Sequence, residues 1–305
     1  MVELTPGKGI ESPVSEARMA NDSRYYVPAQ SPWPIMGAVG LFLMASGAGM
    51  LISHGNPGGW LLLAGALTIT GMLFGWFGHV IHESMSGLYS PQMDRSFRQG
   101  MSWFIFSEVM FFGAFFGALF YARVLSVPWL GGEHLHHLST HQVLWPDFKA
   151  IWPLVTTPGG IQTEAMPWQG LPLINTLLLL SSSVTLQLAH QALERGHRNK
   201  VKLLLGSTVL LGLLFLSLQV LEYYHAYTEM GLTLKSGIYG NTFFMLTGFH
   251  GMHVFLGTLM LAIMWLRVMK GHFNAHHHFA FLASAWYWHF VDVVWLCLFV
   301  FVYIL

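Results

Sequence analysis

The sequence predicts an all-α, polytopic membrane protein with seven transmembrane helices, and three observations support this fold class. First, 54% of the 305 residues are hydrophobic and only 9% are charged, whereas soluble domains average about 25% charged residues. Second, the apolar residues form long continuous runs of the roughly 20 residues that a spanning helix needs. Third, these runs lack the alternation of a β-barrel, so helices are the structure that satisfies the backbone in lipid.

The N-terminal segment, residues 1–33, is polar and contains several prolines. It lacks the short apolar core of a signal peptide. We therefore expect residues 1–33 to form a cytoplasmic segment that precedes the first helix.

The first two spanning helices are predicted at 34–53 and 59–83, and only the short stretch "HGNPGG" separates them. Such a short connection makes the two helices antiparallel neighbours, so residues 34–83 are predicted to form a two-helix hairpin. Glycines spaced four apart allow helix backbones to approach closely. Two such pairs, Gly71 with Gly75 and Gly113 with Gly117, predict packing faces.

The five remaining helices occupy residues 97–304 and are predicted at 97–125, 173–193, 201–225, 240–268 and 279–304. A long loop at about 126–172 separates the first of them from the second. It contains "GGEHLHHLSTH", but the loop histidines (His134, His136, His137 and His141) have no regular ligand spacing. We expect no specific metal site there.

The distribution of Lys and Arg predicts the orientation, because cytoplasmic loops are enriched in these residues. With the N-terminus inside, the inner segments hold most of the basic residues (Lys8, Arg18, Arg24, Arg95, Arg98, Arg195, Arg198, Lys200, Lys202, Arg267 and Lys270). The outer segments hold Arg123, Lys149 and Lys235. Seven spans then place the C-terminus outside.

Glu108 in "FIFSEVMFF" is an acid in the third helix, ten positions after Arg98. At 1.5 Å per residue it lies about 15 Å deeper, near the middle of the membrane. Its neighbours at helical spacing are apolar, so a partner must come from another helix, a lipid or water. Burial disfavours the ionised carboxylate, so we expect Glu108 to be largely protonated. Three roles are open: a proton carrier, a structural group between helices, or a partner for a lipid or another subunit.

Asp292 is the second acid at mid-depth, in "WYWHFVDVVWL" of the last helix. His289 lies three positions earlier on the same helix face. A hydrogen bond between these two side chains within one helix would satisfy both. A structural role is favoured over a place in a proton path.

Histidines in the predicted spans are candidates for haem or metal ligation, but hydrogen bonding between helices is favoured, because spacing alone shows no shaped site. The residues expected to bond in this way are His190, His250, His253 and His289. The stretch "AHHHF" (His276 to His278) lies beside Arg267 and Lys270, which favours contact with anionic head groups.

Cysteine chemistry and nucleic-acid binding are not indicated by the composition. Cys297 is the one cysteine, so there is no internal disulfide and no CxxC motif. The 14 basic and 14 acidic residues give no net charge, so no nucleic-acid partner is implied. We expect no metal ligand in this chain.

Several motifs together resemble subunit III of the haem-copper cytochrome c oxidases, and they follow one another along nearly the whole chain. They are "SPWP" (31–34), "VIHES" (80–84), "GMSWFIFSEVMFF" (100–112), "LAHQAL" (188–193), "LEYYHA" (221–226), "GIYGNTFFMLTGFHGMHVFLG" (237–257) and "HHFAFLASAWYWHFVDVVWL" (277–296). The loop at 126–172 is longer than in mitochondrial members, which fits a bacterial, aa3-type protein.

The resemblance implies a subunit of a proton-pumping oxidase with seven helices, arranged as a two-helix hairpin plus a five-helix bundle with a lipid-filled cleft. It implies no catalytic residue and no redox centre in this chain, with haem a, haem a3 and copper in partner subunits. Subunit I is the main contact, subunit II lies in the same complex, and phospholipids are bound. The subunit supports proton uptake by subunit I and protects the enzyme against turnover inactivation. The implied location is the bacterial inner membrane.

The resemblance also assigns individual residues. Glu108 matches the membrane glutamate of the family that reacts with carbodiimide. The residues that match lipid-contacting positions are Trp76, Glu83, Arg98, Arg267 and Lys270. In two places the chain departs from the family, which often has an Arg-Asp pair at Gly78-His79 and an acid at Leu282.

Three other functions compete with this one. A quinol oxidase subunit III is the first, although such subunits tend to have five helices and lack the first hairpin. A stand-alone proton channel or transporter using Glu108 and Asp292 is the second, but internal repeats and broken helices are absent. A haem-binding redox enzyme that uses the embedded histidines is the third.

Overall fold

The computed structural model describes residues 26–27, 30–53, 57–133, 135–273 and 278–305. The described residues are helical except in connections and contain one isolated β-bridge, between Thr156 and Gln162. Seven helices in them are long and apolar enough to cross a membrane. The predicted all-α fold class is thus confirmed. The predicted segment 1–33, His134, His276 and His277 lie wholly or mostly outside the described residues.

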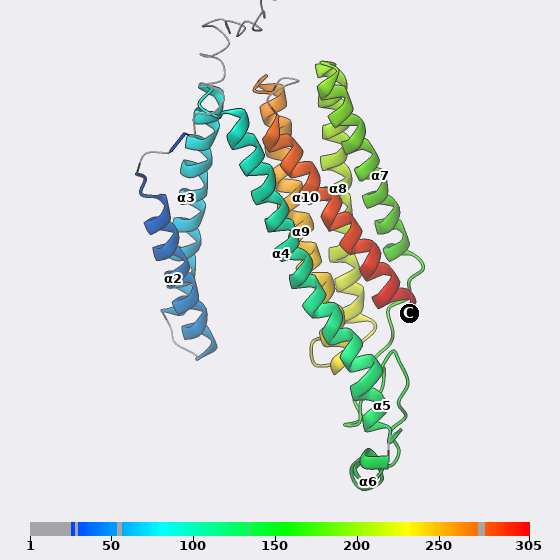
Figure 1. Cartoon of the computed structure of the whole chain (residues 1–305). Coiled ribbons are helices and arrows are strands. Elements are labelled where there is room, and N and C mark those ends of the chain that lie inside the picture. The colour runs from blue at the N-terminus through cyan, green and yellow to red at the C-terminus, as the bar shows by residue number, and fades with distance from the viewer. Residues whose placement is uncertain (1–25, 28–29, 54–56, 134, 274–277) are drawn as a thin grey trace, which may run out of the picture. The chain divides into compact units, whose positions relative to one another are not determined.

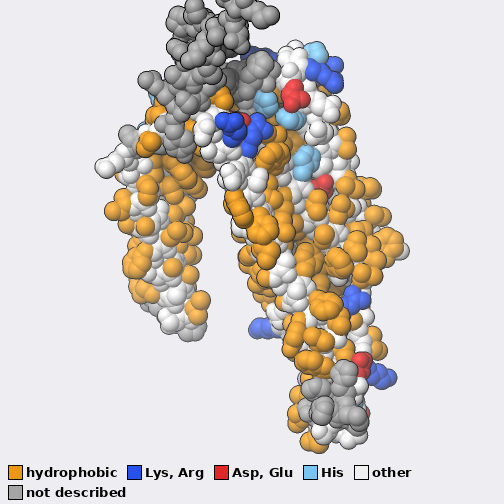
Figure 2. All heavy atoms as spheres, viewed as in Figure 1, with side chains coloured by type: hydrophobic (Ala, Val, Ile, Leu, Met, Phe, Trp, Pro, Cys, Tyr) orange, Lys and Arg blue, Asp and Glu red, His pale blue; other side chains and the backbone are white. Residues whose placement is uncertain are grey.

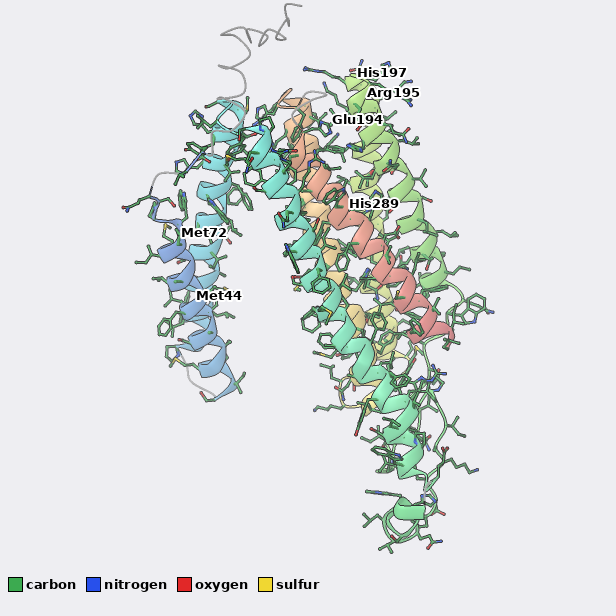
Figure 3. The ribbon with its side chains drawn as sticks, in the orientation of Figure 1. Met44, Met72, Glu194, Arg195, His197 and His289 are labelled. Carbon is green, nitrogen blue, oxygen red and sulfur yellow. The ribbon has the colours of Figure 1, made fainter. Side chains whose placement is uncertain are left out.

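The chain divides into two compact units, residues 1–99 and 100–305. In the first unit, α2 (Trp33–Ile52) packs along α3 (Gly58–Met85) as an antiparallel pair (Figure 1). The contact between the helices is made by small residues. A methyl group added to Gly65 would lie 2.7 Å from the Gly40 carbonyl oxygen, and one added to Gly58 would lie 2.8 Å from that of Gly47. Met44 and Met72 belong to the same pair of helices (Figure 3).

Of the four glycines that the sequence indicated, Gly75 lies at a helix contact, whereas no close contact is seen at the other three among the described residues. An added methyl group on Gly71, Gly113 or Gly117 would meet no described atom within 4 Å, while one on Gly75 would meet the ring of Trp33. The glycines at the contact are seven residues apart within each helix, and each faces a glycine of the other helix. A spacing of four therefore predicts this contact less well than a spacing of seven. Trp33 also donates its Nε1–H to His79 Nδ1 at 3.0 Å, which joins the start of α2 to the end of α3.

The second unit contains most of α4 (Pro91–Tyr121) and the helices α7 (Leu171–Glu194), α8 (Arg198–Thr228), α9 (Ile238–Met269) and α10 (Phe279–Leu298). Helix α7 packs on α8, α8 on α9, α9 on α10, and α10 returns to α7. Phe215, Trp288 and Trp295 lie in the centre of these four helices and are almost completely buried. Apolar side chains also cover much of the visible outer face, as expected for helices in lipid (Figure 2).

Helix α4 is longer than the predicted span 97–125. It begins at Pro91, a residue favoured in the first turn of a helix, and continues through the π-helix η1 (Ala122–Ser126) into α5 (Val127–Leu130). The predicted loop at 126–172 therefore begins five residues later, and it contains the helix α6 (Leu135–Leu144). The last span also continues as a π-helix, η2 (Phe299–Ile304).

Candidate functional site

Glu108 of α4 and His253 of α9 form the candidate site. His253 Nε2 lies 3.0 Å from Glu108 Oε2, and the two side chains are 6% and 22% exposed. The partner of Glu108 thus comes from another helix. The rings of Phe111, Phe112 and Tyr287 surround the imidazole, with centroids 5.0 to 6.3 Å from its own.

The second ring nitrogen of His253 decides how many protons the pair holds. Nδ1 lies 2.6 Å from the backbone carbonyl oxygen of Phe249. A carbonyl only accepts hydrogen bonds, so Nδ1 carries a proton. One further proton must then lie between Nε2 and Oε2, because two unprotonated atoms at this distance would repel each other. The pair is neutral overall, whether the proton belongs to the carboxyl group or forms an imidazolium beside a carboxylate.

Asp292 of α10 lies 7% exposed and bonds to a different helix. Ser183 of α7 donates to Asp292 Oδ2 at 2.7 Å, and His289 Nδ1 lies 3.3 Å from the same hydroxyl oxygen. The expected direct bond from His289 to Asp292 is replaced by one through Ser183. The serine lies between them because α7 packs against this face of α10. Ser183 therefore links both groups, and the contact ties α7 to α10.

His250 of α9 is completely buried, and its Nε2 lies 3.2 Å from the backbone oxygen of Val291 in α10. Nε2 is the donor, because the carbonyl only accepts. The ring lies against Phe215 and Trp295, with centroids 5.7 and 5.0 Å away. This hydrogen bond, which His250 Nε2 donates, joins α9 to α10.

A third embedded acid, Glu222 of α8, was not singled out from the sequence. Its side chain is 1% exposed, and Tyr303 of η2 donates to its Oε1 at 2.6 Å. Gln219 lies one turn earlier on the same face and is also buried. An acid within a predicted spanning helix is the sequence signal that could have identified Glu222. It lies inside the predicted span 201–225, as Glu108 lies inside 97–125.

The residues that match lipid-contacting positions lie in two places. In the first unit, Trp76 is 46% exposed and stacks on Phe77. Glu83 accepts hydrogen bonds from the hydroxyls of Tyr89 at 2.9 Å and Tyr26 at 3.3 Å. Burial, and then the bond to Glu83, raises the pKa of the Tyr89 hydroxyl above its ordinary value, so this group is a donor at neutral pH.

The three cations among these positions differ in their surroundings. Arg98 Nε lies 2.7 Å from Asp94 Oδ2, one helical turn away, and both side chains are about 40% exposed (43% and 41%). Arg267 is 8% exposed, with its guanidinium 4.4 Å from the centre of the Phe273 ring. Lys270 is exposed. Lys270 therefore offers its charge to solvent most directly, whereas Arg98 shares its charge with an acid.

Comparisons with known proteins give one consistent result. The profile of the family described as Cytochrome c oxidase subunit III matches residues 23–305. Cytochrome c oxidase subunit 3 of Oryctolagus cuniculus is 40% identical over 280 residues, which cover 92% of this chain and 96% of the relative. The proteins of the same name from Homo sapiens and Cyprinus carpio are 41% and 39% identical over the same shares.

Proposed function

The chain belongs to the cytochrome c oxidase subunit III family, and from this premise we propose that it is the accessory subunit of a proton-pumping oxidase and has no redox centre of its own. The observation that carries the proposal is the family match along residues 23–305. The subunit stabilises subunit I, supports its proton uptake and protects it during turnover. Haem a, haem a3 and copper belong to the partner subunits, and subunit II lies in the same complex.

The hydrogen bonds of His253 support the proposal that this residue binds no haem. A haem iron needs an imidazole nitrogen with a free lone pair. His253 has one nitrogen on the Phe249 carbonyl and the other on Glu108. His250 has Nε2 on the Val291 carbonyl, and its buried Nδ1 has no hydrogen-bond partner among the described residues. The contacts to Glu108 and to the Val291 carbonyl join α9 to α4 and to α10.

The proposed orientation places the chain in a bacterial inner membrane, with its N-terminus in the cytoplasm and its C-terminus in the periplasm. The basic residues support this assignment. Arg195, Arg198, Lys200 and Lys202 lie where α7 ends and α8 begins, and Arg267 and Lys270 lie where α9 ends. Cations at a cytoplasmic surface favour contact with anionic phospholipids.

Glu108 is proposed to act as a structural group that joins α4 to α9. Glu108→Gln should then leave assembly of the oxidase and most of its electron transfer intact, because the glutamine amide still donates a hydrogen bond to His253 Nε2. The measurement is oxygen consumption by the purified complex, with subunit content checked by gel electrophoresis. Turnover near zero in a fully assembled complex would instead identify Glu108 as a proton carrier that subunit I requires.

Phospholipid binding by Arg98 and Arg267 is proposed to protect the enzyme during turnover. Replacing both residues by alanine should shorten the working lifetime of the oxidase more than it lowers the initial rate, because bound lipid is lost gradually. The measurement is the decay of oxygen consumption during continuous turnover. Arg123→Ala, which changes a basic residue of η1 just beyond the opposite end of α4, serves as the control. Equal lifetimes in the double variant and the parent would contradict the proposal.

A further inference from the structure

Three potential metal ligands meet at the end of the second unit where α7 ends and α10 begins. His190 and Glu194 lie on the last turns of α7, and His278 immediately precedes α10. One ligand atom from each residue lies within 4.8 Å of the other two. Among the described residues this is the one group of three or more such side chains with this geometry.

The distances fit a tetrahedral ion better than they fit a hydrogen bond. His190 Nε2 lies 3.4 Å from His278 Nε2 and 3.8 Å from Glu194 Oε1. Two ligands at about 2.0–2.1 Å from a tetrahedral Zn²⁺ are themselves about 3.3 Å apart. Hydrogen bonds from nitrogen are typically shorter, about 2.7–3.2 Å. The two imidazoles are therefore spaced as zinc ligands are.

The helices hold these side chains in place. His190 and Glu194 are four residues apart, so they project from the same face of α7. The His190 ring stacks on Phe281 of α10, which is fully buried, with centroids 5.8 Å apart and an interplanar angle of 18°. The backbone oxygen of His278 accepts the first helical hydrogen bond of α10, from Leu282. The His190 ring and the backbone of His278 thus have fixed positions before an ion binds.

The ligand types indicate which ion would bind. Two imidazoles and one carboxylate are a set that Zn²⁺ takes with a water molecule in the fourth position. The Glu194 side chain is 53% exposed, so solvent reaches the site and an ion can enter. Glu194 offsets one of the two charges of the ion. Arg195 and His197 follow at the same end of the helix (Figure 3), and the positive charge of Arg195 opposes binding.

We propose that His190, Glu194 and His278 form a Zn²⁺ site that ties the end of α7 to the start of α10. The site is separate from the Glu108–His253 pair and goes beyond the role of an accessory subunit. It also revises the sequence-based expectation of no metal ligand, because residues 88 positions apart in the sequence supply the two imidazoles.

Zinc content of the purified oxidase complex tests the proposal. The complex is treated with a chelator, dialysed against buffered Zn²⁺, and analysed by mass spectrometry for zinc per haem. The parent should bind one more zinc per complex than the variant His278→Ala. Glu194→Gln should weaken this binding by at least about tenfold, since even the outer partners of a metal ligand are worth that much. Because the Glu194 side chain is exposed, Glu194→Gln should not disturb folding. This variant therefore still tests the proposal if His278→Ala fails to assemble.

His225 on α8 and Glu229, the residue that follows this helix, provide a matched control. They have the same spacing of four residues and are 3.0 Å apart, but no third ligand joins them among the described residues. His225→Ala should leave the zinc content unchanged. Equal zinc in the parent, in His278→Ala and in Glu194→Gln would overturn the proposal. Loss of the same zinc from His225→Ala would also overturn it, because the ion would then be held elsewhere.

Discussion

Trp288→Ala is expected to lower the free energy of unfolding of the helical bundle by about 3–5 kcal/mol, the usual cost of truncating a buried tryptophan. Trp288 of α10 is 1% exposed and donates its Nε1–H to Ser182 of α7 at 2.9 Å. Its ring fills the space beside two glycines, and an added methyl group on Gly212 of α8 or Gly257 of α9 would lie 2.8 or 2.9 Å from it. One side chain thus contacts three other helices.

The measurement is the temperature at which this subunit dissociates from the purified oxidase in detergent, followed by size-exclusion chromatography. Trp103→Ala is the matched control, because Trp103 is 64% exposed and its removal leaves no cavity in the chain. Trp288→Ala should lower the dissociation temperature by several degrees relative to this control. Equal temperatures for the two variants would show that the bundle does not depend on the central tryptophan.

His253→Leu is expected to destabilise the contact of α4 with α9 by about 1–3 kcal/mol, because Glu108 would be left without its partner in an apolar setting. A second substitution makes the test specific. Replacing both polar partners by apolar groups can be nearly neutral, so His253→Leu with Glu108→Leu should recover much of the lost stability.

A double-mutant cycle measures this coupling from thermal dissociation of the parent, both single variants and the double variant. His289→Leu combined with Glu108→Leu is the control, because His289 bonds to Ser183 and not to Glu108. The control pair should show additive losses. Additive losses for His253→Leu and Glu108→Leu as well would mean that the 3.0 Å contact contributes nothing to stability.

The positions of the spanning helices could be predicted from the sequence because hydropathy reports them directly. The ends of these helices could not be predicted in this way, because a helix can continue into polar residues beyond the apolar run. Helix α4 begins at Pro91, six residues before the predicted start, and α8 runs to Thr228, three beyond the predicted end. Polar residues at the membrane surface support these extra turns without adding hydropathy.

The embedded polar residues were predictable, but their partners were not. The sequence indicated that Glu108 needs a partner from another helix. It gave no means of choosing His253, which lies 145 positions away. For Asp292 the sequence did indicate a partner, the nearby His289 of the same helix, and that prediction was wrong. Helix packing instead places Ser183 between them, 109 positions from Asp292. Such pairings depend on which helix faces meet, and that is a property of the whole bundle.

The central position of α10 has a consequence for the order in which the chain folds as it is synthesised. The α2–α3 pair joins residues that are close in sequence, so it can close as soon as its second helix has entered the membrane. Helix α7 can pack on α8, and α8 on α9, before the last helix is made, but Ser182 and Ser183 of α7 meet their partners Trp288 and Asp292 only when α10 is in place. A ribosome stalled before residue 279 would therefore hold a complete hairpin and a bundle in which these two serines of α7 still lack their partners.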